Sequence, residues 1–87
     1  MSGDQAAEQE SIAFNNATAT EANFETLCKG AIIRTTADVH IAFDEAANTS
    51  SFLLCATDEP MCFPLNFTRI SAVGDSGSGT LYIIAKR

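Results

Sequence analysis

Ser76 lies in the stretch "GDSG", residues 74–77, and has the surroundings of a catalytic nucleophile. His40 and an aspartate, Asp44 or Asp58, precede it along the chain, so a base and an orienting carboxylate are also present. In acyl transfer a histidine takes the proton of the serine hydroxyl, an aspartate orients the imidazole, and backbone N–H groups hold the oxyanion. These residue types raise the question of whether the chain is a hydrolase.

The order histidine, aspartate, serine is that of chymotrypsin-like proteases, but the surroundings of the three residues differ. That architecture places the site between two barrels, and 87 residues suffice for only one. Position 78 is Ser where the protease motif has a second glycine, and His40 lies in "DVHIA", within an expected strand. Gly, Asp and Ser together are typical of a turn. We therefore expect a hairpin loop at 74–79, no catalytic residues and no enzyme activity.

Four residues near the middle of the chain have side chains that bind metal ions: Asp38, His40, Asp44 and Glu45. Zinc sites prefer several His or Cys ligands, and one His with scattered carboxylates is a weak pattern. Cys62 and His40 could form a nucleophile pair, but a reactive thiolate needs an electropositive setting that this acidic chain hardly offers. An exposed strand that runs into a polar loop explains these residues better, so we expect no metal and no cofactor.

The three cysteines are an odd number at irregular spacing, which is not a disulfide framework. Cys55 and Cys62 could pair across a loop, and nothing in their spacing demands it. We expect Cys28, Cys55 and Cys62 to be reduced, mostly buried apolar residues.

The net charge of −6 argues against several classes of partner. Phosphate binding requires concentrated Lys and Arg, so nucleic acid is not an expected partner, and neither is an anionic membrane. No apolar run reaches the length of a transmembrane helix, and the polar, acidic start is unlike a signal peptide. We expect a chain that is made in the cytoplasm and binds neither nucleic acid nor membrane.

Short β-like runs separated by turn residues dominate the chain from residue 24 onward. Together they predict an all-β domain over 24–87, a small antiparallel β-sandwich or barrel of about six strands. Residues 1–23 hold few large apolar side chains and predict a flexible or extended N-terminal arm. The expected strands are 23–28, 31–36, 39–43, 52–56, 67–73 and 80–85.

Two apolar groups are candidate contacts with a partner. Ile12 and Phe14 share one side of an extended chain, so they could dock the arm on a neighbouring subunit. The irregular stretch "EPMCFPLNF", residues 59–67, supplies the other candidates, Met61, Phe63 and Phe67. Met and Phe on a loop held by proline make good anchors for a partner, but the same loop could fold back over the domain's own core.

The order of the segments resembles small β-sandwich structural proteins of tailed-bacteriophage virions, of the capsid decoration (cement) or head-fibre type. The matching pieces are a Thr/Ala-rich lead-in at 17–28, "GAIIRTTADVHIAF" at 30–43, "FPL" at 63–65 and "TRISAVGDSGSGTLYIIA" at 68–85. The segment 44–62 departs from the simpler glycine-rich loop of that pattern. The resemblance implies a non-enzymatic virion protein that binds and stabilises the shell of the major capsid protein, as a homo-oligomer, expected to be a trimer.

Two alternatives stay open. Within the structural class, the chain could be a head–tail connector or a tail or fibre-base protein. In another class, it could be a small ligand-binding or inhibitory β-domain that uses the loop at 57–67. If the chain is a decoration protein, deletion of residues 1–23 is expected to leave the sandwich folded and to weaken attachment to the shell.

Overall fold

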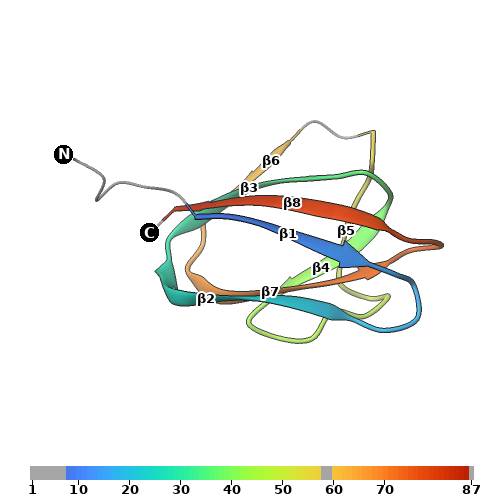
Figure 1. The fold of residues 1–87 in the computed structure, drawn as a ribbon, viewed down its shortest axis with the longest axis horizontal. Helices are drawn as coiled ribbons and strands as arrows, with labels where there is room; N and C mark the ends of the chain where they lie inside the picture. Colours follow the sequence, from blue (N-terminus) through green and yellow to red (C-terminus); the bar gives the residue numbers. More distant parts are fainter. Residues whose placement is uncertain (1–7, 58–59, 87) are drawn as a thin grey trace.

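The computed structural model describes residues 8–57 and 60–86, and within them the chain forms eight β-strands in two sheets (Figure 1). No helix in this described part is long and apolar enough to cross a membrane. The strands are β1 (Glu8–Phe14), β2 (Thr20–Cys28), β3 (Gly30–Thr35), β4 (Val39–Phe43), β5 (Phe52–Leu54), β6 (Met61–Phe63), β7 (Phe67–Gly74) and β8 (Gly79–Lys86).

The order of the strands is that of a jelly roll. One sheet, sheet A, has the order β1-β8-β3-β6, and the other, sheet B, has the order β2-β7-β4-β5. All strand pairs are antiparallel. The chain crosses between the sheets at every connection except the one from β4 to β5. The fold is therefore all-β, a compact antiparallel β-sandwich, as the sequence predicted.

Alternation along β3 and β8 divides the side chains of sheet A between two faces. Ile33, Leu81 and Ile83 are buried between the sheets, whereas Ile32 and Ile84 are exposed on the outside. Burial of an isoleucine or leucine side chain stabilises the fold by about 1.5–3 kcal/mol. Both strands therefore alternate between a buried and an exposed face along most of their length.

The centre of the core is aromatic. Phe67 is fully buried, and its ring lies 5.6 Å from the ring of Phe24 and 5.1 Å from that of Phe43, both in edge-on geometry. Such aromatic pairs contribute about 0.5–1.5 kcal/mol beyond the area that they bury. The three rings come from β7, β2 and β4, so they join the strands of sheet B at one end of the core.

The prediction of an arm over residues 1–23 is wrong for residues 8–23. Residues 8–14 form β1, which pairs with β8 along its whole length, and β2 begins at Thr20. Ile12 and Phe14 do share one side of an extended chain, but that side faces the core, where both are buried. Without β1, strand β8 would have an unpaired edge and the core an open side. The part of the arm prediction on residues 1–7 lies outside the described residues.

A further strand, β6, lies in the proline-containing stretch. It pairs with β3 over three residues and forms an edge of sheet A. Pro60 and Pro64 stand just before and just after it, which suits residues that cannot donate to a sheet ladder. The predicted count of about six strands is therefore two short, because β1 and β6 were not among them.

Strand β7 does not alternate strictly between buried and exposed residues. Phe67 and Ile70 are three residues apart and both are buried, so the alternation slips by one residue between them. Asp44 occupies this irregularity: its Oδ1 accepts the backbone N–H groups of Thr68 at 2.8 Å and Arg69 at 3.0 Å. Asp44 has a φ of 61°, which Asp tolerates better than most residues.

Candidate interaction surface

The "GDSG" loop connects the two sheets and is not a hairpin. β7 ends at Gly74 in sheet B and β8 begins at Gly79 in sheet A, so residues 75–78 cross between them. A Cβ atom on Gly74 would collide with the carbonyl oxygen of Gly77, and one on Gly79 would lie 2.8 Å from the Thr36 hydroxyl. The glycines therefore serve a tight crossing, and the predicted hairpin is corrected to an inter-sheet connection.

His40 is bound to Asp75 of this loop and not to Ser76. Its Nε2 lies 2.8 Å from Asp75 Oδ1, and its Nδ1 lies 3.0 Å from the carbonyl oxygen of Ser51. Both partners are acceptors, so the ring meets them best when both nitrogens carry protons. Neither nitrogen is then left to take a proton from the exposed Ser76 hydroxyl. Asp44 caps β7 instead of orienting His40, and Asp58 lies outside the described residues.

Protonation of His40 is favoured by these contacts. The hydrogen bond to the Ser51 carbonyl raises the pKa of His40, burial opposes this, and the Asp75 carboxylate raises it further. The ring joins β4 to the residue before β5 and to the loop between β7 and β8. We call these contacts of His40 with Ser51 and Asp75 the clasp, because they link three segments of the chain.

The candidate metal ligands are separated by their own hydrogen bonds. Asp38 Oδ1 accepts the backbone N–H of Ala56 at 2.9 Å, while Asp44 serves β7 and His40 serves Asp75. Among residues 8–57 and 60–86, no three His, Cys, Asp or Glu side chains are grouped closely enough to hold a metal ion. The sequence cluster therefore does not become a spatial one.

The five predicted contact residues lie on the inner side of the sandwich. Ile12, Phe14 and Phe67 are buried in the chain's own core, and Met61 and Phe63 are half-buried against it. The Phe63 ring lies 5.4 Å from that of Phe43 in the opposite sheet. Of the two interpretations of the 59–67 stretch, the structure favours the one in which these side chains cover the core.

Exposed apolar side chains gather instead on the outer face of sheet A. Ile32, Tyr82 and Ile84 are 39%, 40% and 41% exposed, and all three belong to the central strands β3 and β8. Ile32 stands directly opposite Ile84 across the strands. Other exposed apolar residues, such as Leu27 and Leu53, belong to the edge strands β2 and β5 of sheet B. Single exposed apolar residues are normal, but an adjoining pair at the centre of a sheet is a candidate contact site.

Basic side chains border this apolar pair. Arg34 stands opposite Tyr82 and Gly30 opposite Lys86, so Lys86 and Arg34 lie on either side of the isoleucines along the two strands. The guanidinium carbon of Arg34 lies 4.5 Å from the centre of the Tyr82 ring, in cation–π contact. We call Ile32, Arg34, Tyr82, Ile84 and Lys86 the sheet A patch.

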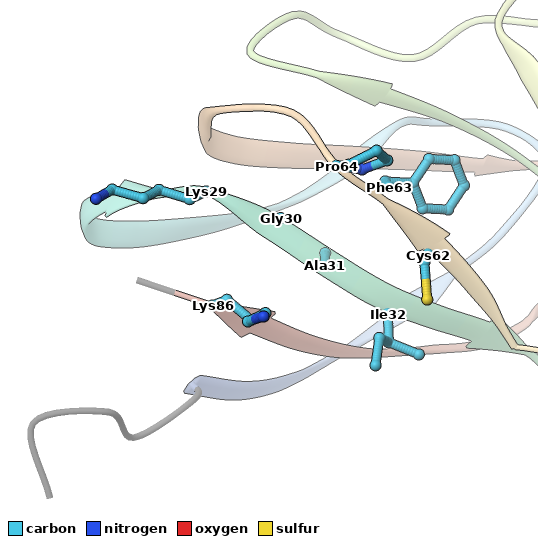
Figure 2. A pocket seen from close by; sticks show the side chains of 8 residues that line it. All are labelled: Lys29, Gly30, Ala31, Ile32, Cys62, Phe63, Pro64 and Lys86. Carbon is cyan, nitrogen blue, oxygen red and sulfur yellow. The ribbon is translucent and has the colours of Figure 1, made fainter. Parts of the chain in front are cut away.

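A shallow groove of about 210 Å³ adjoins the sheet A patch between β3 and β6 (Figure 2). Figure 2 shows Lys29 and Lys86 toward one end of the groove and Ile32, Cys62 and Phe63 toward the other. The backbone N–H of Lys29 donates to the carbonyl oxygen of Lys86 at 2.6 Å, which holds the two lysine backbones together. A second hollow of about 200 Å³ shares Ile32 with the first and continues over Arg34, Tyr82 and Ile84.

The patch was not predicted, although the sequence carries a signal for it. Ile32-Ile33 and Ile83-Ile84 are consecutive isoleucines within expected strands. Because side chains of a strand alternate between faces, one isoleucine of each pair must point away from the core. Two such pairs on neighbouring strands indicate an apolar outer face.

The charge on the patch is opposite to that of the whole chain. The chain carries 11 acidic and 5 basic residues, yet the patch itself holds two bases and no acid. Lys29 adds a third base at the groove, and Glu10 of β1 borders a hollow beside Arg34 and Tyr82. The arrangement can bind a surface that is apolar at its centre and negative around it.

Comparison with protein-family models, with curated proteins and with solved structures found no match for this chain.

Proposed function

We propose that the chain is a non-enzymatic structural protein of a virion, a decoration protein that attaches to the shell of the major capsid protein by the outer face of sheet A. The observation that carries the proposal is the pair Ile32 and Ile84, exposed side by side at the centre of a regular sheet. A sheet whose other face is packed against a core presents such side chains rigidly, and rigid contacts lose little entropy on binding.

The fold is compatible with this role but does not select it. Jelly rolls form viral capsid domains as well as lectin and cupin domains, so fold alone is an analogy. The contacts of His40 with Asp75 and Ser51 support the non-enzymatic part of the proposal, because they occupy both ring nitrogens. The resemblance in segment order to bacteriophage decoration proteins supports the virion, and its trimeric state is part of the same proposal.

The route of attachment differs from the one expected first. Residues 8–14 belong to sheet A, so deletion of residues 1–23 would remove β1 and expose the edge of β8 as well as the core. That deletion is therefore expected to unfold the domain. Point substitutions on the outer face of sheet A are the appropriate test, because they leave every strand in place.

The experiment is co-sedimentation of the purified chain with capsid shells assembled without it. Ile84→Asp is expected to weaken attachment by about ten- to a hundredfold, the equivalent of one lost apolar side-chain contact. Leu53→Asp is the matched control, because Leu53 is also 41% exposed but lies on β5 of sheet B. Equal attachment of the wild type and Ile84→Asp would overturn the proposed surface, and no attachment of the wild type would overturn the proposed function.

A connector, tail or fibre-base role differs only in the position on the particle, which density for the bound chain at a portal or tail would show. Native mass spectrometry tests the subunit number, for which a trimer is expected. A small binding module is the second candidate function, favoured by the groove between β3 and β6. A monomer that binds a soluble ligand and no shell would establish it.

A further inference from the structure

The sheet A patch has a regular pattern along the strand direction. Its rungs are Lys86 opposite Gly30, then Ile84 opposite Ile32, then Tyr82 opposite Arg34. Successive rungs are two residues apart, about 6.7 Å, so the two basic rungs lie about 13 Å from each other. The pattern is basic, apolar, basic.

An extended segment of a partner repeats its side chains with the same spacing. Residues i, i+2 and i+4 of a strand lie on one face at intervals of about 6.7 Å. Carboxylates at i and i+4 would meet the two basic rungs while an apolar side chain at i+2 contacts the isoleucines. In an α-helix, residues i, i+4 and i+8 lie about 6 Å apart along the axis, but each step turns about 40° around it, so they do not stay on a straight line.

We propose that the sheet A patch binds an extended acidic segment of a protein partner that presents a carboxylate, an apolar side chain and a carboxylate at alternate positions. The inference deepens the proposed function, on which it rests for the choice of surface, by giving the chemistry of the capsid segment. The two bases of the patch, Arg34 and Lys86, favour an acidic occupant over a basic one.

The surroundings of Arg34 and Lys86 favour the binding of carboxylates at the two basic rungs. Arg34 is held over the Tyr82 ring, which orients its planar guanidinium while leaving its N–H groups to donate. Lys86 shares its end of the groove with Lys29, whose side chain extends away from Lys86 in Figure 2, so Lys86 supplies the ammonium group for a carboxylate and Lys29 adds positive charge nearby. The apolar side chain at i+2 can extend from Ile32 toward Phe63 and Pro64 along the same groove.

The test uses the full chain and three labelled peptides. The probe is Gly-Ser-Glu-Thr-Val-Thr-Glu-Gly-Ser, in which Glu, Val and Glu share one face when the peptide is extended. The first control replaces both Glu by Gln. The second control, Gly-Ser-Thr-Glu-Val-Glu-Thr-Gly-Ser, has the composition of the probe but places the carboxylates on the face opposite to Val.

The probe is expected to bind weakly but saturably, with a dissociation constant on the order of 0.1–1 mM, by fluorescence anisotropy. Amide chemical shifts should change at Ile32, Arg34 and Ile84, and both control peptides should bind at least several-fold more weakly. Arg34→Gln and Lys86→Gln should each weaken binding of the probe, whereas Arg69→Gln in sheet B should not, with far-UV circular dichroism checking that each variant is folded.

Several results would overturn the inference. These are equal binding of the probe and either control peptide, no saturable binding up to millimolar peptide, or shift changes confined to sheet B. Tighter binding of the chain to mixed phosphatidylcholine and phosphatidylglycerol vesicles than to the probe would assign the patch to a membrane instead. Loss of shell attachment in Ile84→Asp without peptide binding overturns the inference and keeps the proposed function, whereas peptide binding by a chain that attaches to no shell does the reverse.

Discussion

The two outer faces of the sandwich differ in what covers them. On sheet B, residues 44–51 fold over the central strands, where Ala47 packs on Ala42 and Val73 and its N–H donates to the buried Ser71 hydroxyl at 2.9 Å. On sheet A, Ile32 and Ile84 occupy the equivalent central positions and are exposed. Within residues 8–57 and 60–86, the chain therefore covers the centre of sheet B with a loop and leaves the centre of sheet A exposed.

The two outer faces differ in the size of their side chains. Beneath the loop of sheet B, Ala42 is small, Ser71 and His40 are hydrogen-bonded and Val73 is branched but compact, so a loop can lie close to the strands. The outer residues of sheet A are large and branched or aromatic, and they gain more by burial against another surface. The covered face of sheet B and the exposed face of sheet A thus differ in the size of their central side chains.

The largest expected difference is in the free energy of unfolding, between substitutions of one apolar residue on each face. Val73→Asn places a polar amide beneath the loop of sheet B and is expected to cost about 2–4 kcal/mol, from lost burial and unmet hydrogen bonds. Ile84→Asn on sheet A is expected to change the free energy of unfolding by less than about 1 kcal/mol. Urea unfolding measures both, and equal costs would contradict the distinction between the faces.

A smaller effect is expected from the hydroxyl that anchors the loop. Ser71→Ala leaves the Ala47 N–H without its acceptor and should cost about 1–2 kcal/mol, with faster hydrogen exchange at that amide. Ser11→Ala on the exposed side of β1 is the matched control and should be neutral. Unchanged exchange at Ala47 in Ser71→Ala would show that the loop is held by its apolar contacts alone.

Much of the fold was predictable because its signals are local. The runs at 31–36, 39–43 and 80–85 alternate or are rich in β-branched residues, and turn residues separate them. β1 was missed because "EQESIAF" holds only Ile12 and Phe14 as large apolar residues, and its partner β8 lies about 70 residues further along the chain. The pairing of His40 with Asp75 is likewise non-local, across 35 residues.

The contact residues were misplaced for a related reason. A sequence shows that Ile12, Phe14 and Phe67 are apolar and share a side, but not whether that side meets the chain's own core or a partner. Two sheets must pack before inside and outside are defined. The doubled isoleucines are an exception, because alternation alone requires one of each pair to point away from the core.

The clasp on the covered face is expected to make stability depend on pH near neutrality. The pKa of His40 is raised above its ordinary 6.5, so its contribution is fully present below that value and is lost as pH rises through the folded pKa. Thermal unfolding across this range should show a falling midpoint. His40→Gln should flatten the profile, and an unchanged slope in that variant would assign the dependence to other groups.

Asp44 lies where the covering loop begins, and it is expected to make the protein less stable as the pH falls into the acidic range. Hydrogen bonds from the Thr68 and Arg69 backbones lower the pKa of Asp44, so its contribution is present above the ordinary value of 3.8 and is lost as pH falls through the folded pKa. Asp44→Asn keeps an acceptor oxygen and tolerates the positive φ, so it should be milder than Asp44→Ala. Equal losses in the two variants would contradict the capping role.

Chemical modification of Cys62 is expected to have the smallest effect on stability. It also tests the exposed face of sheet A most directly. Cys62 stands opposite Ile32 on β6 and is exposed, whereas Cys28 is buried in the core. A bulky maleimide should therefore modify Cys62 rapidly, as peptide mapping by mass spectrometry would show, and leave the thermal midpoint nearly unchanged. Because the label lies beside the apolar rung of the sheet A patch, it should weaken binding of the acidic peptide and attachment to shells. Prior saturation with either partner should slow the labelling of Cys62, and labelling at an undiminished rate in the bound chain would place the contact elsewhere on the molecule.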